Sequence, residues 1–371
     1  MSKSSIIAFY LPQYRPVEEN DRWFRKGFTE WTSVAKTKPL FKGHIQPRVP
    51  TDLGFYDLRI PEVREEQVAL AKDAGISAFC YYHYWFGNKQ TILEKTLQEV
   101  VASGSPDFPF CLCWANENWT RRWDGNDSEI LISQDYDDEK GWIDHYKYLK
   151  LFFADERYLR DEQDRPIFVI YKPQQIPCLK DRLSCFNEMA LKDGFNGICF
   201  VCQYPQTDIS VMSCFDYLID FEPIESVKQF EINGFKTLRY PPLFLEFLKA
   251  KFNKDVLKKT YSVFDYKTIA KSSYKRKYNH KVWRGTFPGW DNTARRKANA
   301  DIYHNSDPLL FQKYLEKQIQ NTLEAYNNSG DSYIFINAWN EWGEGAYLEP
   351  DEKYEFAYLE AVKKAREKFN V

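Results

Sequence analysis

The sequence predicts an α/β protein, a single (β/α)8 TIM barrel over residues 1–371, on three observations. A length of 371 residues suits one barrel with long loops. Short apolar runs alternate with amphipathic helical patterns, the order that builds a parallel sheet. Most of these runs are continuously apolar, as expected for strands covered on both faces. A doubly wound open sheet is the alternative, but SIIAFYLPQYRP lacks the glycine-rich first turn that a nucleotide-binding version would need.

Eight strands are expected, separated by helices. The expected strands lie near residues 5–11, 77–84, 108–115, 166–171, 197–203, 216–221, 282–287 and 333–339. Of the helical patterns, residues 60–75 place Ile60, Val63, Leu70, Ala71 and Ala74 on one stripe, with Gly75 as the stop. Three connections are long, and each follows a strand: 12–60, 116–140 and 222–281. The loops after the strands build the site of a barrel enzyme, so these loops are expected to be functional.

Composition excludes several classes of protein. The net charge of −2 argues against nucleic acid as a partner. No apolar run is long enough to cross a bilayer, and the N-terminal apolar stretch ends too early, at Pro12, for a signal peptide. The eight cysteines read as buried reduced thiols, and the one C-x-x-C spacing, Cys199 and Cys202, lies in an expected strand without a second pair. These observations predict a cytoplasmic protein.

Aromatic residues make up 17% of the chain, a composition that leans toward carbohydrate, although an aromatic-rich core is the alternative. Residues 222–281 form an expected insertion after strand 6. Its part from 247 to 281 carries eleven Lys or Arg against two Asp, with aromatic residues interleaved. A solvated basic helical insertion explains this segment. The competing hypothesis is a surface for an anionic polysaccharide, a lipid-linked sugar or the inner face of a membrane.

The stretch NAWNEWGEGAYLEPD, residues 337–351, follows the eighth expected strand. Glu341 and Glu344 fall where barrel enzymes keep their catalysts. Cleavage of a glycosidic bond needs one group to protonate the leaving oxygen and a second to act at the anomeric carbon, so these two are the candidate catalytic residues. Trp339 and Trp342 are expected to exclude water and raise one carboxyl pKa. A strand-end turn with surface acids is the alternative, and it explains Glu349, Asp351 and Glu352.

Other loops after strands supply the candidate substrate-binding residues. Flat rings, planar amides and guanidinium groups suit a ligand that needs both stacking and directional hydrogen bonds. Trp-anchored or ordinary surface loops are the alternative for each stretch. The candidates are Tyr10, Gln13 and Trp31 from the first long loop, Tyr82, His83 and Trp85 from residues 79–88, Asn116, Glu117, Trp119, Arg122 and Asp124 from residues 113–127, Trp290, Asp291 and Arg295 from residues 288–297, and Asn340 and Trp342 beside the two acids.

No metal and no cofactor are expected. His83 has no second histidine or acid at metal-ligand spacing, and the phosphate-binding motifs G-x-x-x-x-G-K-[ST] and G-x-G-x-x-G are absent from the sequence. Asp135-Tyr136-Asp137 has the D-x-D form of many sugar-nucleotide-dependent transferases. Its acidic run opens an expected helix, where acids are favoured for structural reasons.

Several of these stretches resemble the WbsX-like family of bacterial surface-polysaccharide proteins. The matching segments run through nearly the whole chain: FYLPQYRPVEENDRWFRKGFTEW, LGFYDLR, CYYHYWF, LCWANENWTRRWDG, WDNTARR and INAWNEWGEGAYLEPD. The resemblance implies a glycosyltransferase of O-antigen or capsule assembly.

The family also looks related to glycoside hydrolase family 99, the endo-α-mannosidases, which are (β/α)8 barrels. Their catalytic segment has the form N-E-W-x-E-G, which residues 340–345 match. The resemblance implies that Glu341 deprotonates the sugar 2-hydroxyl and that Glu344 is the acid/base, with retention at the anomeric carbon.

The expected function is therefore a carbohydrate-active enzyme that forms or cleaves an α-glycosidic bond, with transfer preferred to hydrolysis. Its expected partner is an oligosaccharide or polysaccharide, free or lipid-linked, with peripheral membrane association as a further hypothesis. A retaining endo-α-glycosidase is the second hypothesis, and a catalytically inactive carbohydrate-binding barrel is the third.

Overall fold

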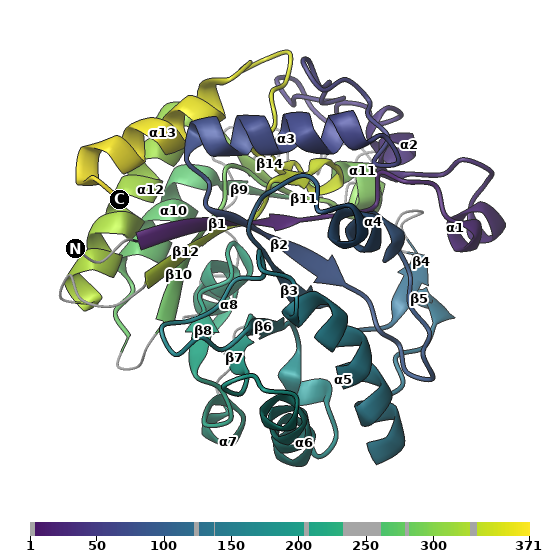
Figure 1. Cartoon of the computed structure of the whole chain (residues 1–371). Coiled ribbons are helices and arrows are strands. Elements are labelled where there is room, and N and C mark those ends of the chain that lie inside the picture. The colour runs from purple at the N-terminus through teal and green to yellow at the C-terminus, as the bar shows by residue number, and fades with distance from the viewer. Residues whose placement is uncertain are drawn as a thin grey trace.

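Eight parallel strands close into a barrel (Figure 1). The computed structural model describes residues 4–121, 126–136, 138–203, 208–232, 261–278, 282–326 and 332–371. The barrel strands are β1 (Ser4–Tyr10), β2 (Ala78–His83), β3 (Phe110–Trp114), β6 (Ile167–Ile170), β7 (Cys199–Cys202), β8 (Tyr217–Ile219), β10 (Val282–Thr286) and β12 (Ser332–Ile336). Each expected strand coincides with one of them, so the predicted fold class is confirmed.

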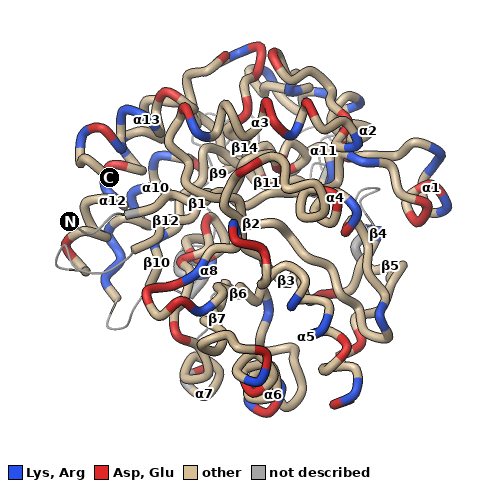
Figure 2. The backbone as a smooth tube through the Cα atoms, in the orientation of Figure 1, with Lys and Arg blue, Asp and Glu red and all other residues tan. Residues whose placement is uncertain are grey.

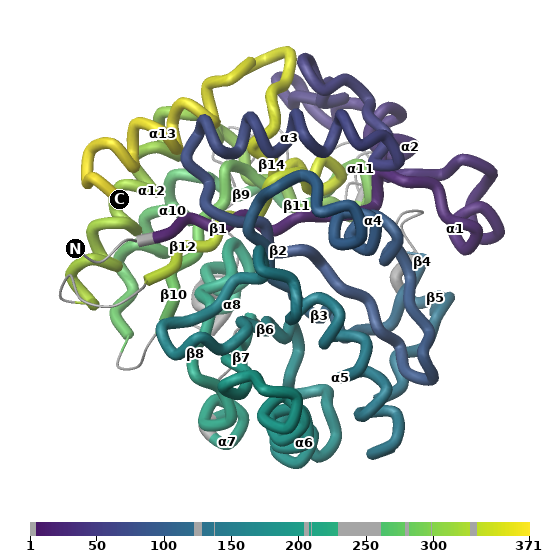
Figure 3. Tube along the Cα trace, in the orientation of Figure 1, coloured from purple at the N-terminus to yellow at the C-terminus, as the bar shows by residue number. Residues whose placement is uncertain are grey.

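The barrel closes where its first strand meets its last. Strand β1 pairs with β2 on one side and with β12 on the other, with Ile6 opposite Ile334. Figure 3 shows this closure as the purple start of the chain lying beside the strand that precedes its yellow end. Because all eight strands are parallel, the loops that follow them reach the same end of the barrel.

Helices surround the barrel. They are α1 (Glu18–Trp23), α2 (Glu30–Val34), α3 (Pro61–Ala74), α4 (Lys95–Ser103), α5 (Glu139–Phe153), α6 (Leu179–Lys192), α7 (Ile209–Met212), α8 (Ile224–Ile232), α10 (Tyr266–Lys275), α11 (Thr293–Arg296), α12 (Pro308–Ala325) and α13 (Ala357–Phe369). Helix α3 ends at Gly75, whose φ of 84° is the left-handed conformation expected of a stop. Ala71 and Ala74 are buried as expected, but Ile60 is the N-cap residue and is 47% exposed.

Side chains alternate between the inside and the outside of the barrel. Phe9 packs inside against Tyr82, Phe221 and Phe335, with ring centroids 5.3–5.6 Å apart. Its neighbour Tyr10 points the other way and donates to Gln67 of α3 at 2.7 Å. This alternation decides which residues of each strand can reach a site at the barrel mouth.

Short strand pairs outside the barrel shape that mouth. They are the hairpin β4 (Trp119–Arg121) and β5 (Asn126–Ile132), the parallel pair β9 (Ser262–Asp265) and β11 (Asp301–His304), and the antiparallel pair β13 (Asn340–Glu341) and β14 (Ala346–Tyr347). None of these pairs was predicted, because each strand is short and its pairing depends on the barrel beneath it.

The insertion after β8 is described only in part. Helix α8, strand β9 and helix α10 belong to it, and Asp265 caps α10 by accepting from the backbone nitrogen of Thr268 at 3.0 Å. Residues 233–260 and 279–281 lie outside the described segments, so both hypotheses for the basic stretch 247–281 remain untested.

The described surface carries both signs of charge. Figure 2 shows Lys and Arg interspersed with Asp and Glu along the helices. All eight cysteines are free thiols. Within the described segments, no helix combines the length and the apolar character that crossing a bilayer would need.

Gly285 allows β10 to approach β8 closely. A Cβ atom built on it would overlap the carbonyl oxygen of Asp220, which is backbone and cannot move aside. We predict that Gly285→Ala lowers the free energy of unfolding by about 1–3 kcal/mol, the usual cost of overpacking. Urea denaturation measures this. Ser184→Ala, an exposed substitution on α6, is the control, and equal stability of the two variants would contradict the account.

Candidate active site

A pocket of about 300 Å³ opens at the end of the barrel where the strands finish. Loops after seven of the barrel strands contribute to it. Its lining residues are Leu11, Tyr82, Tyr84, Ala115, Glu117, Asn118, Trp119, Thr120, Tyr171, Lys172, Phe221, Ile224, Trp290, Asn292, Arg295, Arg296, Asp301, Glu341 and Glu344. Both candidate catalytic residues therefore face one cavity with aromatic walls.

One guanidinium group organises the acidic side of this pocket. Arg295 donates from Nη2 to Glu341 at 2.6 Å and from Nη1 to Glu344 at 2.6 Å. Its Nε donates to Glu30 at 2.7 Å. Because the nitrogens form a rigid planar fork, the three carboxylates have fixed relative positions. Glu341 and Glu344 thus converge on one guanidinium group, as two carboxyl groups that act on one glycosidic bond must lie close together.

The charge of this cluster favours a proton on one carboxyl. Three buried or half-buried acids share one guanidinium. Burial raises the pKa of Glu341 above its usual range, and the charges of Glu344 and Glu30 raise it further, while Arg295 opposes the rise. The prediction that one of the two acids would have a raised pKa rested on tryptophans. The causes in the structure are burial and the neighbouring carboxylates.

The turn that carries the two acids is locked to the first strand. Asn340 accepts from the backbone nitrogen of Leu11 at 2.7 Å and donates to its carbonyl oxygen at 3.0 Å. The single-turn helix η5 (Trp342–Glu344) follows, and Gly345 ends it with a φ of 60°. Gly343 is required for space, because a Cβ there would overlap the carboxylate of Glu30. The two glycines thus serve different purposes.

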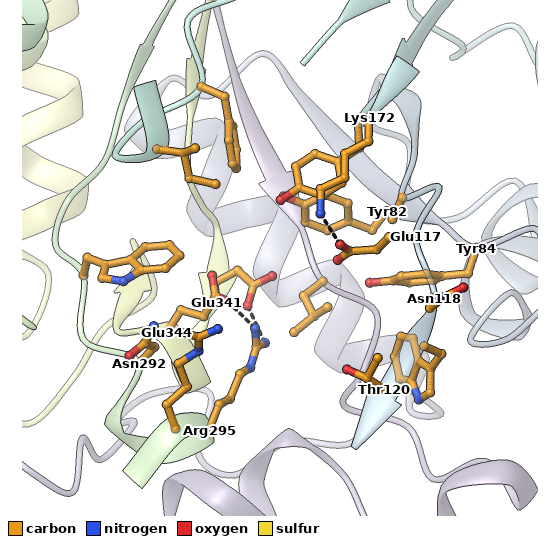
Figure 4. A pocket seen from close by; sticks show the side chains of 18 of the residues that line it. Tyr82, Tyr84, Glu117, Asn118, Thr120, Lys172, Asn292, Arg295, Glu341 and Glu344 are labelled. Atoms are coloured by element: carbon orange, nitrogen blue, oxygen red, sulfur yellow. Dashed lines mark hydrogen bonds and ion pairs between the residues drawn. The ribbon is translucent and has the colours of Figure 1, made fainter. Parts of the chain in front are cut away.

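A second polar wall faces the acids. Figure 4 shows Glu117, Lys172, Tyr82 and Tyr84 across the pocket from Glu341, Glu344 and Arg295. Lys172 forms an ion pair with Glu117. Beside this pair, the ring of Tyr84 meets that of Trp119 edge-on, with centroids 5.2 Å apart. The opposite wall therefore offers hydrogen-bonding groups and ring faces, the combination that carbohydrates require.

The two tryptophans of the acidic turn lie behind the pocket. Trp342 stacks on Tyr347 with centroids 3.7 Å apart and donates to Glu349 at 2.6 Å. Trp339 packs against Phe79 at 5.2 Å. Neither ring lines the cavity, so the expectation that they exclude water from it finds no support in their position. The rings that line the cavity are Tyr82, Tyr84, Trp119, Tyr171, Phe221 and Trp290.

Glu349 is a buried acid, and its assignment to the surface is wrong. Its oxygens accept from Gln67 at 2.6 Å, Tyr56 at 3.0 Å and Trp342 at 2.6 Å. Burial raises its pKa to about 7, against the effect of these hydrogen bonds. Asp351 is also buried and accepts from Tyr347 at 2.5 Å, whereas Glu352 is exposed as expected.

The pocket includes part of the predicted set of binding residues. Tyr82, Glu117, Trp119, Trp290 and Arg295 line it beside the two candidate catalysts. Arg122 and Asp124 lie outside the described residues.

The other predicted binding residues lie behind the pocket wall and shape it. The side-chain amide of Asn116 donates to the backbone carbonyl of Lys172 at 2.7 Å and accepts from its backbone nitrogen at 2.8 Å. Asp291 is buried, accepts from His44 at 2.8 Å and donates from its backbone nitrogen to the carbonyl of Glu344 at 2.6 Å. Trp31 donates to the carbonyl of Tyr56 at 2.8 Å. Tyr10, Gln13, Asn340 and Trp342 are buried as well.

His83 and Trp85 face a helix and not the pocket. Strand alternation points Tyr82 inward, so its neighbour His83 points outward, toward α5. The Nε2 atoms of His83 and His145 lie 2.9 Å apart, and Trp85 stacks on His145 with centroids 4.7 Å apart. Burial lowers the pKa of His83 to about 3, so this histidine is neutral. The expected contact between His83 and a sugar hydroxyl therefore finds no support in its position.

Several lining residues were not among the predicted binding residues, and the pairing of one rim candidate, Glu30, was not foreseen. Tyr84, Asn118 and Asn292 lie in the stretches that the sequence singled out, so composition carried a signal for them. Lys172 follows a strand whose loop showed no distinctive composition, whereas Phe221 lies just before the long loop 222–281 and Ile224 lies near its start, outside its basic stretch. Glu30 belongs to the first long loop, but nothing in the sequence indicates that it pairs with Arg295, 265 positions away.

No metal centre emerges from the part of the chain that the structure describes. Among those residues, no group of three or more His, Cys, Asp or Glu is placed to hold an ion.

The chain belongs to the WbsX glycosyltransferase family, whose model matches residues 6–362. It is 38% identical over 367 residues to the uncharacterized protein WxcX of Xanthomonas campestris pv. campestris, strain B100. That match covers 98% of this chain and 49% of the relative, so the chain spans about half the length of the curated relatives it matches. Family membership supports a carbohydrate-active enzyme.

Solved structures of low sequence identity share the fold. The GH99 endo-alpha-mannosidase from Bacteroides thetaiotaomicron aligns with a TM-score of 0.58 and 13% identity, over 100% of this chain and 98% of that one. A glycoside hydrolase-like protein aligns with a TM-score of 0.59 and 14% identity, over 100% and 95%. These likenesses confirm the barrel.

The raised pKa of Glu349 predicts a pH-dependent contribution to stability. Between about pH 4.5 and pH 7 the folded protein holds a proton on Glu349 that the unfolded chain has lost, so this contribution falls as pH rises through the interval. Glu349→Gln should remove the fall, a difference of at most about 1.4 kcal/mol per pH unit. Urea denaturation of both proteins at pH 5, 6 and 7 measures it. Glu352→Gln is the exposed control, and parallel pH dependence of Glu349→Gln and the wild type would contradict the assignment.

Proposed function

We propose that the chain is a retaining glycosyltransferase or transglycosidase that acts on an α-glycosidic bond in the assembly of a bacterial surface polysaccharide, O-antigen or capsule. Glu341 and Glu344 are its proposed catalytic residues. The observation that carries the proposal is the pair of carboxylates held by Arg295 at the edge of a cavity with aromatic walls. Membership of the WbsX glycosyltransferase family supports transfer as the reaction.

The proposed reaction has two displacements. In the first, Glu341 takes the proton of the sugar 2-hydroxyl, and the resulting oxygen attacks the anomeric carbon. Glu344 donates its proton to the leaving oxygen as the glycosidic bond breaks. In the second, Glu344 takes a proton from the acceptor hydroxyl, and the acceptor oxygen attacks the anomeric carbon. The bond between this carbon and the 2-oxygen breaks, and Glu341 gives its proton back to the 2-oxygen. Two inversions give net retention.

Features of the site support this division of roles. A carboxylate with a raised pKa is a stronger base once ionised, and burial gives Glu341 this property. Glu344 is the more exposed of the pair, with 18% of its side chain accessible against 6% for Glu341, so it is the better placed to meet a leaving group and an incoming acceptor. The resemblance of residues 340–345 to the catalytic segment N-E-W-x-E-G supports the same assignment.

The proposed substrate is an oligosaccharide or polysaccharide, free or lipid-linked. Tyr82, Tyr84, Trp119 and Trp290 offer ring faces for stacking, and Glu117 with Lys172 offers charged hydrogen-bonding groups. The same proposal places the site of action in the cytoplasm, at the inner face of a membrane. It also treats the chain as one catalytic domain with residues 222–281 as its insertion.

A retaining endo-α-glycosidase is the second candidate function. The fold likeness to a structure named as an endo-alpha-mannosidase favours it, because the same two acids could pass the glycosyl group to water. An inactive carbohydrate-binding barrel is the third candidate. Products separate the three: an elongated glycan indicates transfer, free sugar indicates hydrolysis, and bound but unchanged glycan indicates the binding module.

Loss of either acid should stop turnover while leaving binding largely intact. We predict that Glu344→Gln and Glu341→Gln each lower kcat by at least about 100-fold, the usual contribution of general acid–base catalysis. A panel of fluorescent α-linked oligosaccharides, including α-mannosides, supplies the substrates, and fluorescence anisotropy reports binding. Glu352→Gln, an exposed acid eight positions after Glu344, is the control. Full activity in both site variants would reject these catalysts.

The pH profile should identify the base. Because Glu341 must be ionised to accept the 2-hydroxyl proton, kcat/KM should rise with pH. The midpoint of this rise should lie well above the usual pKa of a glutamate, near 4.5. Initial rates from pH 4 to 9 measure this. If kcat/KM falls through the same range, Glu341 acts as the protonated acid, and the two roles are exchanged.

A further inference from the structure

We propose that Glu30 is a positioning residue for the reaction: its carboxylate holds the Arg295 guanidinium in the orientation that brings the two terminal nitrogens to Glu341 and Glu344. The inference rests on the proposed function of those two acids. It adds the first long loop to the catalytic assembly, and Glu30 precedes Glu341 by 311 positions in the sequence. Glu30 does not line the pocket, so it acts on the two acids through Arg295 and through its charge.

The hydrogen-bonding pattern leaves Arg295 little freedom. Each of its three guanidinium nitrogens donates to a different carboxylate, at 2.6 or 2.7 Å. The bond from Nε fixes the direction of the planar group about the side-chain axis, and the two Nη bonds follow from it. Glu341 and Glu344 must release or accept protons during the proposed reaction, whereas Glu30 takes no part in proton transfer and can hold Arg295 throughout.

The surroundings of Glu30 fix the position of its carboxylate. It is the first residue of α2 and is fully buried, and its backbone nitrogen donates to the carbonyl of Gln13 at 3.1 Å. An acid is also favoured at this helix N-terminus. Gly343 leaves room for its carboxylate, because a Cβ at that position would overlap Glu30 Oε1. The turn between the two catalysts is thus shaped around Glu30.

The charge of Glu30 has a separate consequence. With it, three carboxylates share one guanidinium, and the charge of Glu30 is among the causes that raise the pKa of Glu341, after burial and the charge of Glu344. Arg295 opposes this rise. The neighbouring phenols Tyr14, Tyr82 and Tyr84 also have raised pKa values, mainly through burial and in part through the charge of Glu341. Removal of the Glu30 charge should therefore ease ionisation of Glu341.

Two substitutions separate position from charge. Glu30→Gln keeps an oxygen that can accept from Arg295 Nε but removes the charge. We expect the titration midpoint of Glu341 to fall by about one pH unit, the usual effect of a nearby charge. Glu30→Ala removes both, and we expect it to lower kcat at least tenfold more than Glu30→Gln does. If Glu30 were needed only for folding, Glu30→Gln and Glu30→Ala would not differ in kcat in this way.

Gly343→Ala tests the same contact from the other side. A Cβ at residue 343 would push Glu30 away from Arg295, so this variant should lose kcat as Glu30→Ala does. In the double variant Glu30→Ala/Gly343→Ala, the second substitution should lower kcat little further, because the first has already removed the contact between Glu30 and Arg295. Fully additive losses in kcat would overturn the positioning role. Glu99→Gln, which removes an acid paired with Arg15 outside the pocket, is the control.

A titration without substrate keeps the inference testable if the proposed function fails. Carbon-13 NMR of glutamate-labelled protein identifies the Glu341 carboxyl as the signal missing from Glu341→Gln. A lower midpoint in Glu30→Gln than in the wild type supports the coupling, whether or not any glycan turns over. An unchanged midpoint, with circular dichroism showing a folded variant, would overturn it. Turnover that fails in every variant and in the wild type would reject only the proposed function.

Discussion

The arrangement of the site depends on one buried ionic cluster, in which Arg295 binds Glu30, Glu341 and Glu344. Buried charges are costly unless they are paired, and removal of one partner from such a cluster typically costs about 3–5 kcal/mol. Arg295 reaches all three acids because α11 follows β10, α2 follows β1 and the acidic turn follows β12, and these three strands are neighbours in the barrel. The closed barrel thus supplies the geometry, and the cluster supplies the charge.

Residues behind the pocket fix the loops that line it. Asn340 binds the acidic turn to Leu11, Asp291 holds the backbone of Glu344, and Asn116 joins the loop after β3 to the loop after β6. None of these side chains lines the cavity, yet each fixes a loop that does. A polar residue in a loop after a barrel strand can therefore be essential to the site without any contact with the substrate.

The sequence predicts the fold well because its signals are local and periodic. The eight continuous apolar runs each correspond to one strand, and Gly75 ends α3 as its position predicts. The position of Glu341 and Glu344 after the last strand was also predictable, since loops after barrel strands build the site. The family resemblance added roles for both residues that periodicity alone does not provide.

The predictions that failed concern direction and distance. Tyr82 and His83 are neighbours on a strand, so only one of them can face the barrel interior, and composition does not say which. The tryptophans beside the acids were expected to exclude water and to raise one carboxyl pKa, but they pack behind the pocket around Glu349. The pairing of Glu30 with Arg295 joins two loops with no shared pattern, so only the three-dimensional structure reveals it.

The most direct test of the central claim is a crystal structure of Glu344→Gln with a bound α-linked oligosaccharide. The account predicts a glycosidic oxygen within hydrogen-bonding distance of residue 344, a 2-hydroxyl beside Glu341, and Arg295 still bound to Glu30. A glycan bound elsewhere on the barrel, or one whose anomeric carbon lies away from both residues, would contradict it.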